Sequence, residues 1–245
     1  MPLQPLEPQR LYRQIAEQLR AGMLSGEFAV GTRLPAEREL AVQLGVSRPS
    51  VREALIALEV EGWVEVRTGS GVYVLERNAR SQSTTVGSTG PATAVSPTEW
   101  GPLELIRARR VIEGETAALA ASLAQPEHIH AMEQALLTMQ AEAAQGSAPL
   151  DGDRAFHSAI VQASGNAVLV ETVHSFWDAR RGPLFTRLGG YFETPRSWRT
   201  ALKEHQTILA AIRAQDPAAA RAAMHAHMDK SHSRLSASWQ HATPA

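Results

Sequence analysis

The chain has 245 residues, a length typical of one large domain or two small ones. Its composition, 44% hydrophobic and 20% charged with a formal net charge of -1, is that of a globular protein and excludes a disordered or fibrous one. No apolar run approaches the ~18 residues of a membrane span, and the opening MPLQPLEPQR lacks the basic-then-apolar order of a secretory signal. Because the chain also has no cysteine, we expect a cytoplasmic protein without disulfides, thiolate metal sites or membrane contact.

The first 77 residues predict three helices followed by a β-hairpin. Apolar residues recur at helical spacing, and stops at glycines place the helices at about 12–23, 35–44 and 47–61. The second and third helices, joined around Gly45, form a helix-turn-helix. Two short apolar runs, 63–66 and 72–75, flank a glycine-rich tip and predict a wing. Residues 1–77 should therefore form a winged helix-turn-helix.

Residues 78–99 are dominated by Ser, Thr, Gly and Pro, which is the composition of a linker. The remaining segment, 100–245, is rich in alanine and shows helical periodicity between glycine and proline breaks. We expect about six helices there, packed as an antiparallel bundle with no strand. The predicted fold class is thus mostly α with a small β wing.

Nucleic-acid binding cannot be inferred from overall charge, because residues 1–77 carry nine Lys and Arg against ten Asp and Glu. It rests instead on the placement of a few side chains. Arg48 and Arg52 lie four residues apart near the start of the third helix, where arginine can donate two hydrogen bonds to guanine. Ser47 and Ser50 can add hydroxyl contacts, and Arg38 can reach the DNA backbone or the same groove. Taken singly, such arginines are more often solubility residues; together with a wing they favour DNA.

The segments 31–41, 45–55, 61–63 and 69–71 resemble the GntR family of bacterial transcription regulators. The resemblance implies that Arg38, Arg48 and Arg52 contact operator DNA and that the wing residue Gly69 approaches the minor groove. Pro49 departs from the small hydroxyl residue that some members have, which removes a side-chain contact there.

Histidine is confined to the second half of the chain, and some of these residues face the predicted bundle interior. Asp153 and His157 share an inward stripe one turn apart, while His205 and His227 lie on the apolar faces of two later helices. Imidazole and carboxylate ligands suit a divalent transition metal, with zinc expected and nickel or manganese as alternatives. A buried polar network is the other interpretation of the same four residues.

The second segment is similar to the FCD effector domain of the FadR branch of that family, over residues 103 to about 235. The motifs that carry this resemblance are 109–113, 153–157, 164–166, 204–205 and 223–227. In metal-binding members an Asp, the His four residues later and one His on each of two later helices hold the metal. The resemblance therefore implies Asp153, His157, His205 and His227 as ligands.

Arg109 falls on an apolar face of the first bundle helix, and a guanidinium there needs an anion. A small carboxylate effector would supply one in bidentate form, and an ion pair with Glu113 or Asp153 is the alternative. Arg180 is a second candidate for effector binding.

We therefore expect a homodimeric, sequence-specific DNA-binding transcription regulator, acting as a repressor, whose C-terminal domain senses a small organic acid through a bound metal. A dimer is needed to read the two half-sites of a palindromic operator. Two rivals remain from the residues alone. One is a metal-dependent hydrolase-like helical domain, and the other is a DNA-binding protein whose metal is purely structural.

Overall fold

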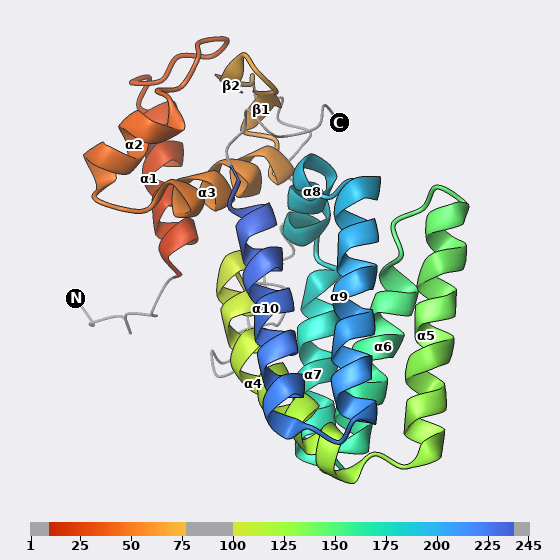
Figure 1. The fold of residues 1–245 in the computed structure, drawn as a ribbon. Coiled ribbons are helices and arrows are strands. Elements are labelled where there is room, and N and C mark those ends of the chain that lie inside the picture. The colour runs from red at the N-terminus through yellow and green to blue at the C-terminus, as the bar shows by residue number, and fades with distance from the viewer. Residues whose placement is uncertain (1–9, 77–99, 238–245) are drawn as a thin grey trace, which may run out of the picture.

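A computed structural model describes residues 10–76 and 100–237. The N-terminal part is a winged helix, drawn in red to orange in Figure 1. It consists of the elements α1 (Leu11–Leu24), α2 (Glu37–Leu44), α3 (Arg48–Val60), β1 (Val64–Arg67) and β2 (Gly71–Val74). The strands pair antiparallel, with Val64 opposite Val74, and Arg33 adds an isolated bridge to Tyr73. The predicted winged helix-turn-helix is confirmed.

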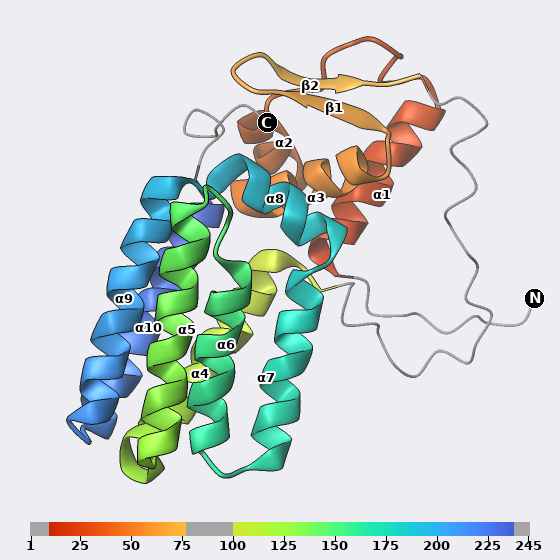
Figure 2. The ribbon, with the colours of Figure 1, turned by 90° about the vertical axis from the view of Figure 1, so that its right-hand side faces the viewer.

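The described residues of the C-terminal part form seven helices. Their bounds are α4 (Pro102–Leu123), α5 (Pro126–Ala144), α6 (Leu150–Ala163), α7 (Ala167–Arg180), α8 (Pro183–Phe192), α9 (Pro195–Arg213) and α10 (Pro217–Leu235). All but α8 run up and down as a bundle, and α8 lies across the end of the bundle that faces the winged helix (Figures 1 and 2). Among the described residues the bundle contains no strand, as the sequence predicts.

Local chemistry explains where several helices begin and end. Ser47 caps α3 by accepting a hydrogen bond from the Ser50 amide, and Gly45 ends α2 in the left-handed conformation (φ 66°). Gly114 of α4 lets α10 approach closely, because a Cβ at this position would collide with the His225 ring. The two helices thus pack side by side along the bundle.

The described residues form one large hydrophobic core in each part, and a small third cluster, Val161, Val173 and Trp177, joins α6 to α7. The winged-helix core gathers α1, α2, α3 and the wing around Ile15, Leu40 and Leu58, whereas the bundle core is built around Phe156, Ile208 and Met224. They meet where α8 packs on α3 at the end of the bundle, as Figure 2 shows from the side. Ile56 of α3 belongs to the bundle core, so the two parts are joined by apolar contact as well as by the chain.

The helix count differs from the sequence prediction of six. The additional element is α8, which continues through Gly189 and Gly190, two residues that the sequence places in a break. Glycine costs a helix roughly 1 kcal/mol relative to alanine, and the burial of Phe185, Leu188 and Tyr191 on one face outweighs that cost. The predicted linker lies wholly outside the described residues, and the division into 1–77, 78–99 and 100–245 stays a prediction.

Candidate functional site

A groove of about 250 Å³ runs between the wing and the starts of α2 and α3. Its lining includes four arginines, namely Arg33, Arg38, Arg48 and Arg67. Arg38 and Arg48 are exposed as the sequence predicts, and the Arg48 side chain retains 51% of its accessible surface. Gly69 sits at the wing tip with φ +77°, a conformation that favours glycine. A cationic, concave surface of this kind fits the phosphate backbone of DNA.

The two serines have different surroundings. Ser47 Oγ accepts the Ser50 amide at 3.2 Å and lies 2.8 Å from Ser50 Oγ, so both hydroxyls serve the helix cap. Ser47 is exposed and Ser50 is half-buried. A contact to DNA by either hydroxyl stays a prediction.

Arg52 departs from the exposed stripe that helical spacing predicts. Only 1% of it is exposed, its Nε and Nη2 donate to Glu37 at 2.9 and 2.8 Å, and its guanidinium lies over the Phe192 ring of α8. The reason lies in tertiary contacts. Helix periodicity cannot reveal that α2 places the buried Glu37 carboxylate beside α3, or that α8 covers the same face of α3. A base contact by Arg52 would require Glu37 and α8 to release it.

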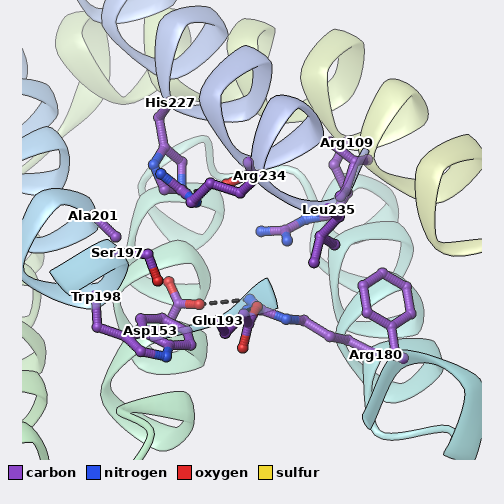
Figure 3. A pocket seen from close by; sticks show the side chains of 13 residues that line it. Arg109, Asp153, Arg180, Glu193, Ser197, Trp198, Ala201, His227, Arg234 and Leu235 are labelled. Atoms are coloured by element: carbon purple, nitrogen blue, oxygen red, sulfur yellow. Dashed lines mark hydrogen bonds and ion pairs between the residues drawn. The ribbon is translucent and has the colours of Figure 1, made fainter. Parts of the chain in front are cut away.

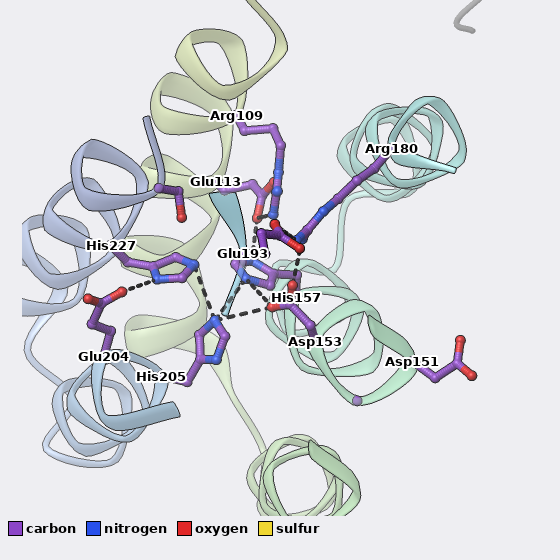
Figure 4. Close-up of polar contacts among 12 residues, drawn as sticks. Arg109, Glu113, Asp151, Asp153, His157, Arg180, Glu193, Glu204, His205 and His227 are labelled. Atoms are coloured by element: carbon purple, nitrogen blue, oxygen red, sulfur yellow. Dashed lines mark hydrogen bonds and ion pairs between the residues drawn. The ribbon is translucent and has the colours of Figure 1, made fainter. Parts of the chain in front are cut away.

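The four predicted metal ligands meet inside the bundle, from α6, α9 and α10 (Figure 4). His205 Nε2 lies 3.2 Å from the Nε2 atoms of both His157 and His227, and 3.3 Å from Asp153 Oδ1. All four ligand atoms lie within 4.8 Å of one another, and all four residues are at least 95% buried.

Two carboxylates orient the histidines from behind. Glu113 of α4 faces His157 Nδ1, and Glu204 of α9 lies 2.8 Å from His227 Nδ1. Each carboxylate selects the tautomer with the proton on Nδ1 and leaves the Nε2 lone pair facing the centre, which is the arrangement of metal-bound histidines. The sequence analysis did not single out Glu204, although its place beside His205 in the quoted motif is a signal for it.

The charges of the cluster follow from burial and from these partners. Burial lowers the pKa of His205 and of His227 well below the usual histidine value. Burial also lowers that of His157, but the Glu113 carboxylate outweighs it and the net pKa is raised. Burial favours the neutral acid of Asp153, yet the Arg180 guanidinium and the histidines hold its pKa well below the ordinary range. His205 and His227 are thus neutral, and Asp153 ionised, as metal ligands must be.

The arrangement fits a divalent metal. Three imidazole Nε2 atoms face one another, and with Nδ1 protonated on His157 and His227 both of their Nε2 atoms are acceptors. The single ring proton of a neutral His205 can serve only one of these two acceptors. A tetrahedral shell with bonds of 2.0–2.1 Å separates its ligand atoms by about 3.3 Å, close to the 3.2–3.5 Å of the neighbouring pairs. Asp153 Oδ1 is buried without a hydrogen bond, as expected of a ligand atom.

A cavity of about 30 Å³ adjoins this cluster (Figure 3). Asp153 and His227 form part of its wall, and the two predicted effector-binding arginines, Arg109 and Arg180, form another part. Arg109 donates to Glu113 from Nε at 2.5 Å, which is one of the ion pairs considered as the alternative to a bound carboxylate. Arg180 donates to Asp153 Oδ2 at 2.5 Å and to Glu193 Oε1 at 3.3 Å.

Comparison with known proteins agrees with both halves of this description. Residues 11–74 match the family described as bacterial regulatory proteins, gntR family, and residues 104–230 match the FCD domain. The chain belongs to the GntR family. GntR proteins of this kind are DNA-binding transcription regulators, so operator DNA is the partner of this chain. Helix α3, the second helix of the helix-turn-helix, occupies the position of a recognition helix in that motif.

Named relatives and a solved structure extend over nearly the whole chain. The chain is 39% identical to the Uxu operon transcriptional regulator of Escherichia coli over 93% of its own length and 87% of the relative's. It is 36% identical to the Exu regulon transcriptional regulator of the same organism, over 91% and 83%. The solved structure of Streptococcus agalactiae GntR aligns with 25% identity and a TM-score of 0.45, covering 90% of this chain and 98% of that one.

These relatives are transcription regulators and not enzymes, so the hydrolase alternative is removed. Within residues 10–76 and 100–237, no helix has the length and apolar character to cross a bilayer.

Proposed function

We propose that this GntR regulator is a repressor that binds a palindromic operator as a homodimer and senses a small organic acid in its FCD domain. One observation carries the proposal. A single cavity has two members of the candidate metal cluster and three arginines, Arg109, Arg180 and Arg234, in its wall, so a ligand inside it meets both kinds of carboxylate-binding group.

Asp153, His157, His205 and His227 would hold the metal, with zinc favoured because imidazole nitrogen and carboxylate oxygen are its usual ligands. The metal supplies a coordination position for one carboxylate oxygen. Arg109 and Arg180 supply the guanidinium donors that fix the orientation of the acid. Trp177 supports both arginines, with its ring centroid 4.5 Å from Arg109 Cζ and 4.9 Å from Arg180 Cζ.

On the DNA side we propose that Arg38 and Arg48 contact the operator, with Ser47, Ser50 and Gly69 close to the phosphates. Arg33 and Arg67, which the sequence analysis did not select, line the same groove and extend the cationic surface to the wing. Two such surfaces, one from each subunit, would read half-sites about one DNA turn apart.

The experiment starts from operator fragments selected out of random DNA by the full-length chain. Operator affinity is then measured for the zinc-loaded protein with and without L-lactate, L-malate and succinate. At least one acid should change the affinity by roughly 5–150-fold, and operator should change the affinity for that acid by the same factor. The replacement Arg109→Ala should abolish the response. If zinc binds but no acid alters either operator affinity or the melting temperature, the metal is structural and the protein is not a sensor of these acids.

A further inference from the structure

The effector cavity is tight for an organic acid in the arrangement described here. A volume of about 30 Å³ holds roughly two water molecules, fewer atoms than a three- or four-carbon acid has. A side chain of the wall that moves aside would widen the cavity. Glu193 is the candidate, because it lines the cavity, carries a negative charge and retains 22% side-chain exposure through which it can swing toward solvent.

Arg180 is shared unequally between two carboxylates. Its Nη1 lies 2.5 Å from Asp153 Oδ2, a residue fixed within α6 and 3% exposed at its side chain. Its Nη2 lies 3.3 Å from Glu193 Oε1, a longer contact with a residue that stands directly after the end of α8. An incoming carboxylate that binds Arg180 would thus replace Glu193 more readily than Asp153 (Figure 3).

We infer that Glu193 is an internal occupant of the carboxylate subsite on Arg180, and that its displacement by an effector loosens α8 from the recognition helix α3. The inference rests on the proposed function, since it names how that same site is regulated. The contacts that transmit the effect are the ion pair between Glu193 and Arg180 and the short helix α8.

The end of α8 provides the mechanical link. Tyr191 and Phe192 directly precede Glu193, so they move when its backbone moves. The Tyr191 hydroxyl donates to Glu59 of α3 at 2.8 Å, and the Phe192 ring lies beneath the Arg52 guanidinium. Arg187, one turn earlier in α8, donates twice to the same Glu59 carboxylate, both at 2.9 Å. The polar and cation–π contacts between α8 and α3 therefore all involve the last six residues of α8, directly before Glu193, whereas Glu53 and Ile56 of α3 join it to the rest of the bundle.

Docking of α3 on α8 fixes the orientation of the winged helix relative to the bundle. In a dimer this orientation sets how two recognition helices face two half-sites. When the contact is lost, DNA binding must restrict a freer winged helix, and the operator affinity falls. An acid that replaces Glu193 therefore acts as an inducer that releases the repressor.

The full-length chain allows a direct test because it has no native cysteine. In the double variant Val42→Cys, Leu137→Cys, two spin labels occupy exposed positions on α2 and α5. Dilution with unlabelled chain restricts the measured distances to one subunit. Without any acid, Glu193→Gln should give a longer and broader distance distribution than the wild type. The matched control Glu171→Gln, at an exposed glutamate of α7, should leave it unchanged.

Glu59→Gln, which removes the charge at the α3 side of the contact, should broaden the distribution as Glu193→Gln does. An unchanged distribution in Glu193→Gln overturns the inference, whether or not Glu59→Gln has an effect. Calorimetry then measures the affinity of the zinc-loaded wild type and variant for L-lactate, L-malate and succinate. Any acid that binds should bind Glu193→Gln about tenfold more tightly than the wild type, which is the value of one charge-assisted hydrogen bond. If no acid binds either protein, the proposal that the protein senses these acids is wrong. The distances between the spin labels still decide whether Glu193 holds α8 on α3.

Discussion

Glu37 at the start of α2 and Arg52 of α3 form a buried ion pair, with Arg52 Nη2 2.7 Å from Glu37 Oε2 and side-chain exposures of 5% and 2%. The other oxygen of the same carboxylate accepts from Arg48 Nε at 2.9 Å. Two arginines one helical turn apart thus share one partner, but only Arg48 also faces solvent. This difference leaves Arg48, and not Arg52, exposed for contact with another molecule.

The replacement Arg52→Ala should therefore destabilise the winged helix. It leaves the Glu37 carboxylate buried with one exposed partner, and breaking a buried pair from one side costs ~3–5 kcal/mol. Urea unfolding should show this loss in the free energy of unfolding. If Arg52→Ala unfolds like the wild type but loses discrimination at a single base pair, Arg52 reads DNA as the family resemblance implies.

Arg48→Ala should have the opposite profile. Its side chain is half exposed, so the free energy of unfolding should change by less than about 1 kcal/mol, whereas discrimination at one operator base pair should fall by roughly 1–3 kcal/mol. Operator titrations at fixed salt with single-base variants of the selected fragment measure the second quantity. Equal affinity of Arg48→Ala and wild type for every variant would remove Arg48 from the reading surface.

A substitution of Glu204 tests whether the carboxylate that contacts His227 Nδ1 orients this histidine for metal binding. In Glu204→Gln the partner of His227 Nδ1 loses its charge, and zinc affinity should fall about 10–100-fold, as is usual for residues that orient metal ligands. Zinc affinity should be unchanged in Glu171→Gln, the same substitution at a solvent-exposed glutamate. Equal zinc affinities of Glu204→Gln and wild type would show that the tautomer of His227 does not depend on this contact.

Glu53 gives the fold a predicted pH dependence at the boundary between winged helix and bundle. Its carboxylate accepts the Leu103 amide at 2.8 Å, and burial raises its pKa from 4.5 to about 7. Because the folded pKa lies above the unfolded one, Glu53 binds protons more tightly in the folded state. Its contribution to stability is thus greatest below about pH 4.5 and is lost as the pH rises to about 7.

Glu53→Gln keeps an acceptor for Leu103 without this titration. At pH 8 the variant should be more stable than the wild type, with an upper limit on the order of 3 kcal/mol, and the difference should shrink toward pH 4.5. Chemical unfolding of both proteins across this range measures it. A stability difference that is constant with pH would contradict the raised pKa.

The sequence predicts those features that depend on local periodicity. Ser47 caps α3 and Gly45 ends α2, as their residue types predict. Asp153, His157, His205 and His227 all face inward, because the direction of a side chain on a helix follows from its position in the turn. The motif resemblance then supplied what periodicity lacks, namely that these four residues meet at one place.

The features that sequence reasoning missed depend on contacts between distant segments. Helix α8 exists because its apolar face is buried, although two adjacent glycines in it favour a break. Arg52 is buried by Glu37 and Phe192, which lie 15 residues before it and 140 residues after it, and no pattern along α3 reports either neighbour. The role proposed for Glu193 likewise depends on its contact with Arg180 across the cavity, which the sequence does not reveal.

The central claim is that the cluster of one aspartate and three histidines holds a divalent metal, and calorimetric titration of zinc into the metal-free, full-length chain tests it most directly. One zinc per chain should bind to the wild type and to His130→Ala, the matched substitution at an exposed histidine of α5. His205→Ala, which removes the ligand at the centre of the contacts, should lose binding at least 100-fold. No zinc binding by the wild type, or wild-type affinity in His205→Ala, would contradict the metal site.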